Sequence, residues 1–276
     1  MKTEAIEKYM IHNGEILNTK LNMPNRDLIT NIVYEVIRVI DGVPLFLEEH
    51  MSRLSKSSKM LNINMEHLTD SITHNMKKLI AINDNPQKNI KIILYIAHDS
   101  CIHYSIFFIQ SNYPAPELYK KGIHTILFRA ARQNPNAKVQ NLDLRERINK
   151  ELLESNAYEA LLLNEADEIT EGSKSNLFFV KDGSLYTSPK QKVLLGVTRT
   201  RVIELAKKLG IEVIEEPIHK SFLEECNGLF ITGTSPKILP VSSVNHIEYM
   251  SPKNETIQII VKAYNSLIKD YIENHK

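Results

Sequence analysis

Hydrophobic and polar residues follow a short-period pattern over much of the first 110 positions. Residues 32–40 are rich in β-branched side chains, and the pair Asp41-Gly42 separates them from a second apolar run at 43–47. An Asp-Gly pair between two such runs is a strong hairpin signal, so we expect two antiparallel strands here. Two more apolar runs, 90–97 and 102–109, flank the polar residues 98–100 and predict a second hairpin.

Apolar residues also recur at helical spacing in several longer segments. These segments are 48–54, 68–82, a stretch after residue 138, 197–209 and 257–272. In the stretch after residue 138, Leu142, Ile148, Leu152 and Leu153 define the expected apolar side. Gly210 is a C-terminal signal for the helix that precedes it.

The second half of the chain contains further short apolar runs that predict strands. They lie at 124–129, 160–163, 176–180 and 228–232. Strands and helices in this order predict an α+β fold with two sheet-based domains. The proline-rich segment around 111–117 is the best candidate linker. We therefore expect a small N-terminal domain at 1–112, a linker at 113–121 and a larger C-terminal domain at 122–276.

Composition narrows the class of protein further. The 276 residues carry a formal net charge of +1, with 42% apolar residues, so neither nucleic acid nor an anionic membrane is an expected partner. No run approaches the length of a membrane span, and the first residues lack an apolar signal core. Cys101 and Cys226 lie far apart without metal-ligand spacing, which predicts two reduced thiols in a cytoplasmic protein and no metal site.

Several polar segments are candidates for chemistry, and each also has a plain structural interpretation. Thr198 could cap the helix after it and leave N–H groups for a phosphate, or serve as an ordinary cap. Residues 232–236 could bind an anion or form a polar turn. Glu171 could be a solvated loop residue or a buried carboxylate that pairs with a cation. Lys138 has no local feature that separates it from surface lysines, and the charged run 143–147 is more simply a solvated helix face than a basic site.

In this order, the segments resemble those of the fold-type IV pyridoxal-phosphate (PLP) enzymes. That class IV aminotransferase family includes branched-chain and D-amino-acid aminotransferases and aminodeoxychorismate lyase. The resemblance spans about residues 34–241. The motifs are H-x-x-R-L at 50–54, YEALLL at 158–163, TEGS at 170–173 with SNLF at 175–178, VLLGVTR at 193–199, and FITGTS at 230–235 with Pro-Val at 240–241.

The resemblance implies a fold of a small N-terminal α/β sandwich and a larger C-terminal domain of sheet and helices, with PLP as cofactor. Lys138 would be the catalytic residue, which forms a Schiff base with the cofactor. The implied cofactor-binding residues are Arg53, Glu171, Leu194, Val197, Thr198 and Thr234. Among them, Glu171 would pair with the pyridine nitrogen, Leu194 would pack on the ring, and the others would bind the phosphate.

Substrate preference is less strongly marked. The region 91–99 has no arginine of the kind D-amino-acid aminotransferases use, and Leu142 stands where branched-chain aminotransferases often have tyrosine. The candidate substrate contacts are Tyr34, Arg38, Lys91, Tyr95 and Ser235. We expect an aminotransferase that moves an amino group between a branched-chain-like amino acid and a 2-oxo acid, acting as a homodimer. The alternatives are aminodeoxychorismate lyase and a non-catalytic PLP-binding scaffold, and the presence of both Lys138 and Glu171 disfavours the scaffold.

Overall fold

The chain forms two compact units in a computed structural model that describes residues 4–20, 32–96, 99–131 and 134–276. Unit 1 comprises Met1–Asn112, Ala137–Gln140 and Ile268–Lys276, and unit 2 comprises Tyr113–Asn136 and Asn141–Leu267. The predicted limits of independently folding domains, 1–112 and 122–276 with the linker at 113–121, stay a prediction. Both units combine helices with a sheet, which confirms the α+β fold class.

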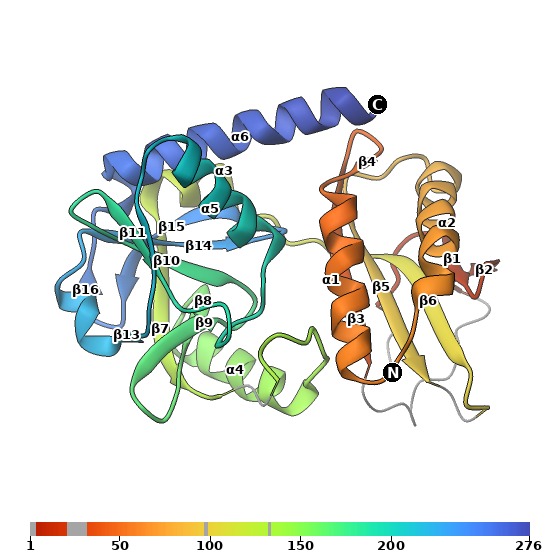
Figure 1. The fold of residues 1–276 in the computed structure, drawn as a ribbon, viewed down its shortest axis with the longest axis horizontal. Coiled ribbons are helices and arrows are strands. Elements are labelled where there is room, and N and C mark those ends of the chain that lie inside the picture. The colour runs from red at the N-terminus through yellow and green to blue at the C-terminus, as the bar shows by residue number, and fades with distance from the viewer. Residues whose placement is uncertain (1–3, 21–31, 97–98, 132–133) are drawn as a thin grey trace. The chain divides into compact units, whose positions relative to one another are not determined.

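Unit 1 is built on an antiparallel six-stranded sheet in the order β2-β1-β6-β5-β3-β4 (Figure 1). The strands are β1 (Tyr9–His12), β2 (Glu15–Asn18), β3 (Val33–Ile40), β4 (Val43–Pro44), β5 (Asn89–Ile96) and β6 (Ile102–Ile109). Both predicted hairpins are present, and the pair β1–β2 was not predicted. The predicted strand 90–97 ends in Ala97, which lies with His98 outside the described residues.

The first hairpin turns where the sequence predicts. Asp41 and Gly42 both have positive φ angles, 51° and 78°, as a tight two-residue hairpin turn requires. The return strand is shorter than predicted, since β4 covers Val43–Pro44 alone. Phe46 adopts a left-handed conformation with φ of 52°, which ends the extended backbone and lets α1 begin at Leu47.

Helices α1 (Leu47–Met60) and α2 (Thr69–Ile82) confirm the two helices predicted in this region. A short 3₁₀ turn, Glu66–Leu68, precedes α2. Both helices pack on one face of the sheet in a shared apolar core that includes Leu54, Met76 and Ile92. On the opposite face, Ile93, Tyr95 and Phe107 belong to a separate apolar cluster. The two faces explain the period-2 burial along β3.

Unit 2 contains a ten-stranded sheet in the order β12-β11-β10-β14-β15-β7-β8-β9-β13, with β16 paired to β15. The strands are β7 (Ile123–Arg129), β8 (Glu159–Leu163), β9 (Glu168–Gly172), β10 (Asn176–Lys181), β11 (Ser184–Thr187), β12 (Val213–Glu215), β13 (Ile218–His219), β14 (Gly228–Gly233), β15 (Lys237–Val244) and β16 (Ile247–Glu248). The helices are α3 (Pro116–Lys121), α4 (Leu142–Glu154), α5 (Val197–Lys208) and α6 (Glu255–His275), with 3₁₀ turns at Lys220–Glu224 and Ser251–Lys253. The last residues of α6, from Ile268 on, belong to unit 1.

Four strands predicted in the second half, now β7, β8, β10 and β14, are confirmed, and the segment 168–172 is a strand that the pattern did not reveal. It lacks a long apolar run, which explains why periodicity missed it.

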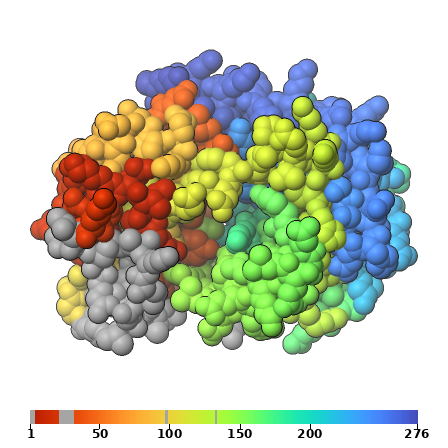
Figure 2. All heavy atoms as spheres, turned by 180° about the vertical axis from the view of Figure 1, so that it is seen from behind, coloured from red at the N-terminus to blue at the C-terminus, as the bar shows by residue number. Residues whose placement is uncertain are grey.

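Helix α4 differs from the prediction in which residues it buries. Ile148 is buried, but Leu142 and Leu153 are 55% and 83% exposed, so their assignment to the apolar side was wrong. The helix lies at the surface of unit 2 (green in Figure 2) and carries the charged run 143–147. Asn141 caps it by accepting the N–H of Leu144 at 3.0 Å.

No helix within the described residues is long and apolar enough to cross a bilayer. Cys101 is exposed and Cys226 is buried, and both thiols are free. Burial raises the pKa of the Cys226 thiol to about 11.

Candidate active site

Lys138 lies in a short segment of unit 1 that pairs with the beginning of β3. Its carbonyl oxygen accepts the N–H of Tyr34 at 3.0 Å, and its own N–H donates to Ser57 Oγ of α1 at 3.2 Å. The next residue, Val139, forms a bridge with Val33. The backbone around Lys138 is therefore fixed by residues about 80 to 105 positions earlier in the chain.

The ring of Tyr34 interacts with two ammonium groups. Lys138 Nζ lies 4.8 Å from the ring centroid, and Lys91 Nζ lies 5.3 Å from it. Both distances fall within the range of a cation–π contact. The Lys91 side chain is only 8% exposed and pairs with Glu4 at 2.6 Å. The half-buried Lys138 thus has a defined position over an aromatic ring, unlike a solvated surface lysine.

Arg53, the predicted phosphate ligand, is oriented by a buried carboxylate. Glu35 occupies a core-facing position of β3 and is fully buried. Arg53 Nε donates to Glu35 Oε2 at 2.8 Å, and its Nη2 donates to Oε1. His50 Nδ1 lies 3.1 Å from the same Oε1. This two-point contact restricts the direction of the guanidinium group.

Electrostatics in this cluster favour a charged Glu35 and a neutral His50. Burial acts to raise the pKa of Glu35, but the charge of Arg53 and the hydrogen bonds from Arg53 and His50 outweigh it and hold that pKa well below its ordinary value. Burial lowers the pKa of His50, and the positive charges of Arg53 and Lys138 lower it further against the opposing effect of Glu35. Lys138 and Arg53 therefore share one electrostatic neighbourhood in unit 1.

In unit 2, Glu171 lies on β9 and is only 3% exposed. Its Oε2 accepts the backbone N–H of Leu194 at 3.0 Å, and Asn176 Nδ2 lies 3.5 Å away. Asn176 also donates to the carbonyl oxygen of Leu194 at 2.8 Å. The interpretation of Glu171 as a solvated loop residue is wrong, and that of a buried carboxylate agrees with the structure.

Helix α5 begins directly beyond this network. Its N-cap is Gly196, so the expectation that Thr198 caps the helix is wrong. Thr198 and Val197 are buried in the first turn, and the hydroxyl of Tyr264 donates to Thr198 Oγ1 at 3.4 Å. Because Gly196 has no side chain to cap the first-turn N–H groups, this helix start suits an anionic group.

The predicted phosphate-binding turn joins β14 to β15. Thr232 ends the buried part of β14 opposite Asn176 of β10, and Thr234 and Ser235 follow in the turn. The Thr232 hydroxyl is buried, and no group within the described part of the chain bonds to it. A buried hydroxyl without a protein partner is rare, so this atom fits the edge of a ligand site.

Among the other candidate substrate contacts, Tyr34 and Tyr95 belong to the same apolar cluster of the unit 1 sheet. Tyr95 is 3% exposed and stacks on His103 at 5.7 Å. Arg38 lies four residues further along β3 from Tyr34, or ~13 Å. Ser235 is half-buried in the turn of unit 2. Substrate contact by these residues stays a prediction, as do the cofactor roles.

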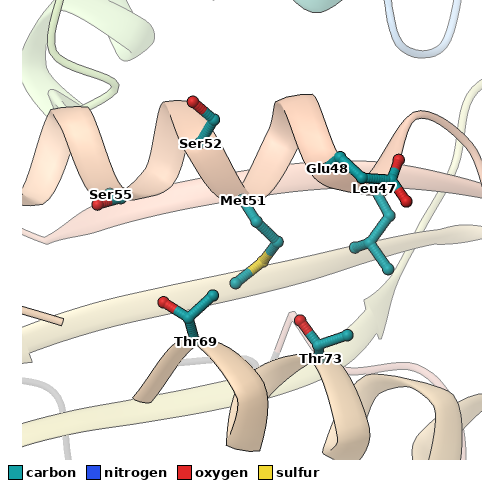
Figure 3. A pocket seen from close by; sticks show the side chains of 7 residues that line it. All are labelled: Leu47, Glu48, Met51, Ser52, Ser55, Thr69 and Thr73. Carbon is teal, nitrogen blue, oxygen red and sulfur yellow. The ribbon is translucent and has the colours of Figure 1, made fainter. Parts of the chain in front are cut away.

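Unit 1 also has a groove between α1 and α2 (Figure 3). Met51 points into it from α1, and Thr69 and Thr73 face it from α2. No predicted site residue lines this groove, so it carries no part of the candidate site. Likewise, the described residues include no cluster of three or more metal-ligating side chains.

The sequence motifs assigned no role to Glu35, His50 or Asn176, although His50 and Asn176 lie within motifs and Glu35 within the strand predicted at 32–40. A signal was available for Glu35. It lies on the same face of the strand as Val33, Ile37 and Val39, so a charged residue stands at a core-facing position, where it needs a partner. Asn176 had no such local signal, because its partners come from other segments.

Comparison with known proteins identifies the family of the chain. A family model described as amino-transferase class IV matches residues 32–244. A putative branched-chain-amino-acid aminotransferase of Methanocaldococcus jannaschii is 34% identical over 227 residues, which cover 77% of this chain and 78% of the relative. A D-alanine aminotransferase of Bacillus licheniformis is 27% identical over 224 residues, covering 77% and 78%.

Solved structures of branched-chain aminotransferases are also similar to this chain. The branched-chain amino acid aminotransferase of Escherichia coli has a TM-score of 0.86 and 26% identity, and the match covers 95% of both chains. The branched-chain aminotransferase of the archaeon Thermoproteus uzoniensis, solved with norvaline, has a TM-score of 0.80, 21% identity and coverage of 98% of this chain and 97% of that chain. The second match shows the fold alone.

The chain belongs to the class IV aminotransferase family. It is a transaminating enzyme with the fold-type IV architecture, as the sequence motifs predicted. The alternatives of a lyase and of a non-catalytic scaffold are not favoured by these relatives.

Proposed function

We propose that this enzyme uses PLP to move an amino group between a branched-chain-like amino acid and a 2-oxo acid. The observation that carries the proposal is the position of Lys138, whose backbone is bonded to β3 and α1 and whose ammonium lies over Tyr34. Membership of the class IV family supports the cofactor, and the names of the relatives support the substrate class.

The residues present fit such a cofactor. Arg53, the uncapped start of α5 at Val197 and Thr198, and Thr234 would bind the phosphate dianion, because each offers N–H or hydroxyl donors or a positive charge. The buried Thr232 hydroxyl beside that turn is consistent with a polar ligand there. Leu194 would pack on the ring, and the substrate would contact Tyr34, Arg38, Tyr95 or Ser235.

PLP, when bound, supplies an aldehyde that condenses with amines and a pyridinium ring that withdraws electrons from the substrate. Lys138 would bind the aldehyde carbon and, once released by the substrate, carry the proton between the substrate Cα and the cofactor C4′. Glu171 would keep the pyridine nitrogen protonated, a role that a buried carboxylate can perform without competition from water.

The test is Lys138→Ala beside the exposed control Lys150→Ala. Wild type and control should bind PLP, absorb in the visible range and become covalently labelled after borohydride. Lys138→Ala should lose the label and at least ~10³-fold of kcat, because the nucleophile is removed. A branched-chain amino acid added without a 2-oxo acid should convert wild type to the pyridoxamine form.

Three results would contradict the proposal. They are a wild-type protein that takes up no PLP, borohydride labelling that persists in Lys138→Ala, and release of pyruvate from aminodeoxychorismate without formation of the pyridoxamine form. A homodimer, which rests on the family resemblance, and a cytoplasmic location, which rests on the two reduced cysteines, belong to the same proposal.

A further inference from the structure

Glu159 is a buried carboxylate of unit 2 for which the proposed chemistry has no use. It begins β8 and is 4% exposed. Its Oε1 accepts Ser173 Oγ–H at 2.6 Å, Ser173 N–H at 3.1 Å and Ala160 N–H at 2.9 Å. Its Oε2 accepts Ser175 Oγ–H at 2.9 Å and Lys174 N–H at 3.3 Å. All five donors are neutral, and four of them belong to the turn after β9.

The turn that Glu159 binds joins the two residues that contact each other in the candidate site. Glu171 precedes it and Asn176 follows it, and residues 172–175 lie between them. Gly172 N–H donates to the Ser175 carbonyl at 2.8 Å, which closes the turn. A Cβ at Gly172 would lie 2.0 Å from Ser175 Oγ and 3.2 Å from Glu159 Oε2, so any other residue here would displace the serine hydroxyl that bonds to Glu159.

We propose that Glu159 is a positioning residue, which sets where the Glu171 carboxylate lies by fixing the turn 172–175, an inference that rests on the proposed function. Burying a carboxylate is strongly unfavourable unless hydrogen-bond donors compensate it. Here four of the five donors come from one turn, so the carboxylate fixes that turn together with the 2.8 Å bond from Ser173 N–H to the Ala160 carbonyl. Displacing a catalytic group by about 1 Å can cost roughly 100-fold in rate.

The experiment compares Glu159→Gln with Glu168→Gln at the other end of β9, where the carboxylate pairs with Lys192. Each protein is loaded with PLP, and its absorbance is titrated with pH beside kcat and the melting temperature. The variant Glu171→Gln serves as a reference, because it shows how the pH titration changes when the carboxylate at the pyridine nitrogen is lost. Glu159→Gln should shift the pH titration toward that of Glu171→Gln and lower kcat about 10- to 100-fold, whereas Glu168→Gln should leave both unchanged.

The outcomes separate the two proposals. A Glu159→Gln protein that melts earlier but keeps the wild-type titration and kcat would show a structural role alone and overturn the inference. If Glu171→Gln itself behaves as wild type, the proposed role of Glu171 fails instead. Should Glu159→Gln not fold, the double variant Ser173→Ala, Ser175→Ala removes the two hydroxyl donors and must then shift the same titration, or the inference is wrong.

Discussion

Two buried carboxylates, Glu35 of unit 1 and Glu159 of unit 2, are stabilised in different ways. Glu35 bonds mainly to the side chains of Arg53 and His50, beside one bond from the N–H of Val36. Glu159 bonds to backbone N–H groups and serine hydroxyls. The first arrangement restricts the direction of another charged side chain, and the second restricts the path of a turn. Each carboxylate acts on a residue proposed to bind the cofactor. Glu35 contacts Arg53 directly, and Glu159 is connected to Glu171 through the turn.

This difference predicts how the protein responds when each carboxylate is removed by mutation. Removing Glu35 leaves a buried guanidinium without its counter-charge, which costs stability above all. Removing an acceptor from Glu159 leaves neutral donors unpaired, which costs less stability but moves a backbone segment. Unit 1 should therefore respond to mutation mainly through stability, and unit 2 mainly through the geometry of its site.

The largest stability effect is expected from Glu35→Ala. It should destabilise unit 1 by about 3–5 kcal/mol, because a buried ion pair loses one partner. Hydrogen exchange followed by mass spectrometry can measure the effect separately on peptides of each unit. Peptides of β3 and α1 should lose protection while those of β8 and β9 do not. The control Glu66→Gln, which removes an exposed partner of Lys59, should change neither.

A smaller effect is expected from Gly196→Ala. The added methyl would lie 2.0 Å from Asn176 Oδ1, and Asn176 is fixed by its bond to the Leu194 carbonyl. The cost should be about 1–3 kcal/mol, as for other overpacked buried sites. In an Asn176→Ala background the same change should cost less, because the obstructing oxygen is gone. Equal costs in the two backgrounds, measured by urea unfolding, would show that this contact is not the cause.

The smallest effect is the response of unit 1 to mild acid. The folded protein holds the pKa of His50 below its usual 6.5, so the unfolded chain binds more protons and stability falls as pH drops below about 6.5. The pKa of Glu35 is also lowered, so its contribution is present above about pH 4.5 and is lost as pH falls further. The urea midpoint of unit 1 peptides should decline between about pH 7 and 5 in wild type. In His50→Gln this first decline should be absent, and a flat wild-type profile would exclude the effect.

The local pattern of apolar and polar residues determined many of the secondary-structure elements of this protein. The Asp41-Gly42 turn, the strands beside it and helices α1, α2, α5 and α6 all follow from residues close in sequence, whose spacing sets which side chains share a face. The motifs also nominated Lys138, Glu171 and Arg53 as candidate site residues, and they predicted the class IV family to which the chain belongs.

Tertiary structure alone decided what surrounds those residues. The segment of Lys138 bonds to β3 and α1, Glu35 bonds to a helix about 15 or more residues away, and Glu159 bonds to the turn between β9 and β10. Helical spacing placed Leu142 and Leu153 on an apolar side, yet both are exposed. Burial and hydrogen bonding depend on which distant segments contact each other. The local spacing of apolar residues in one sequence does not specify those contacts.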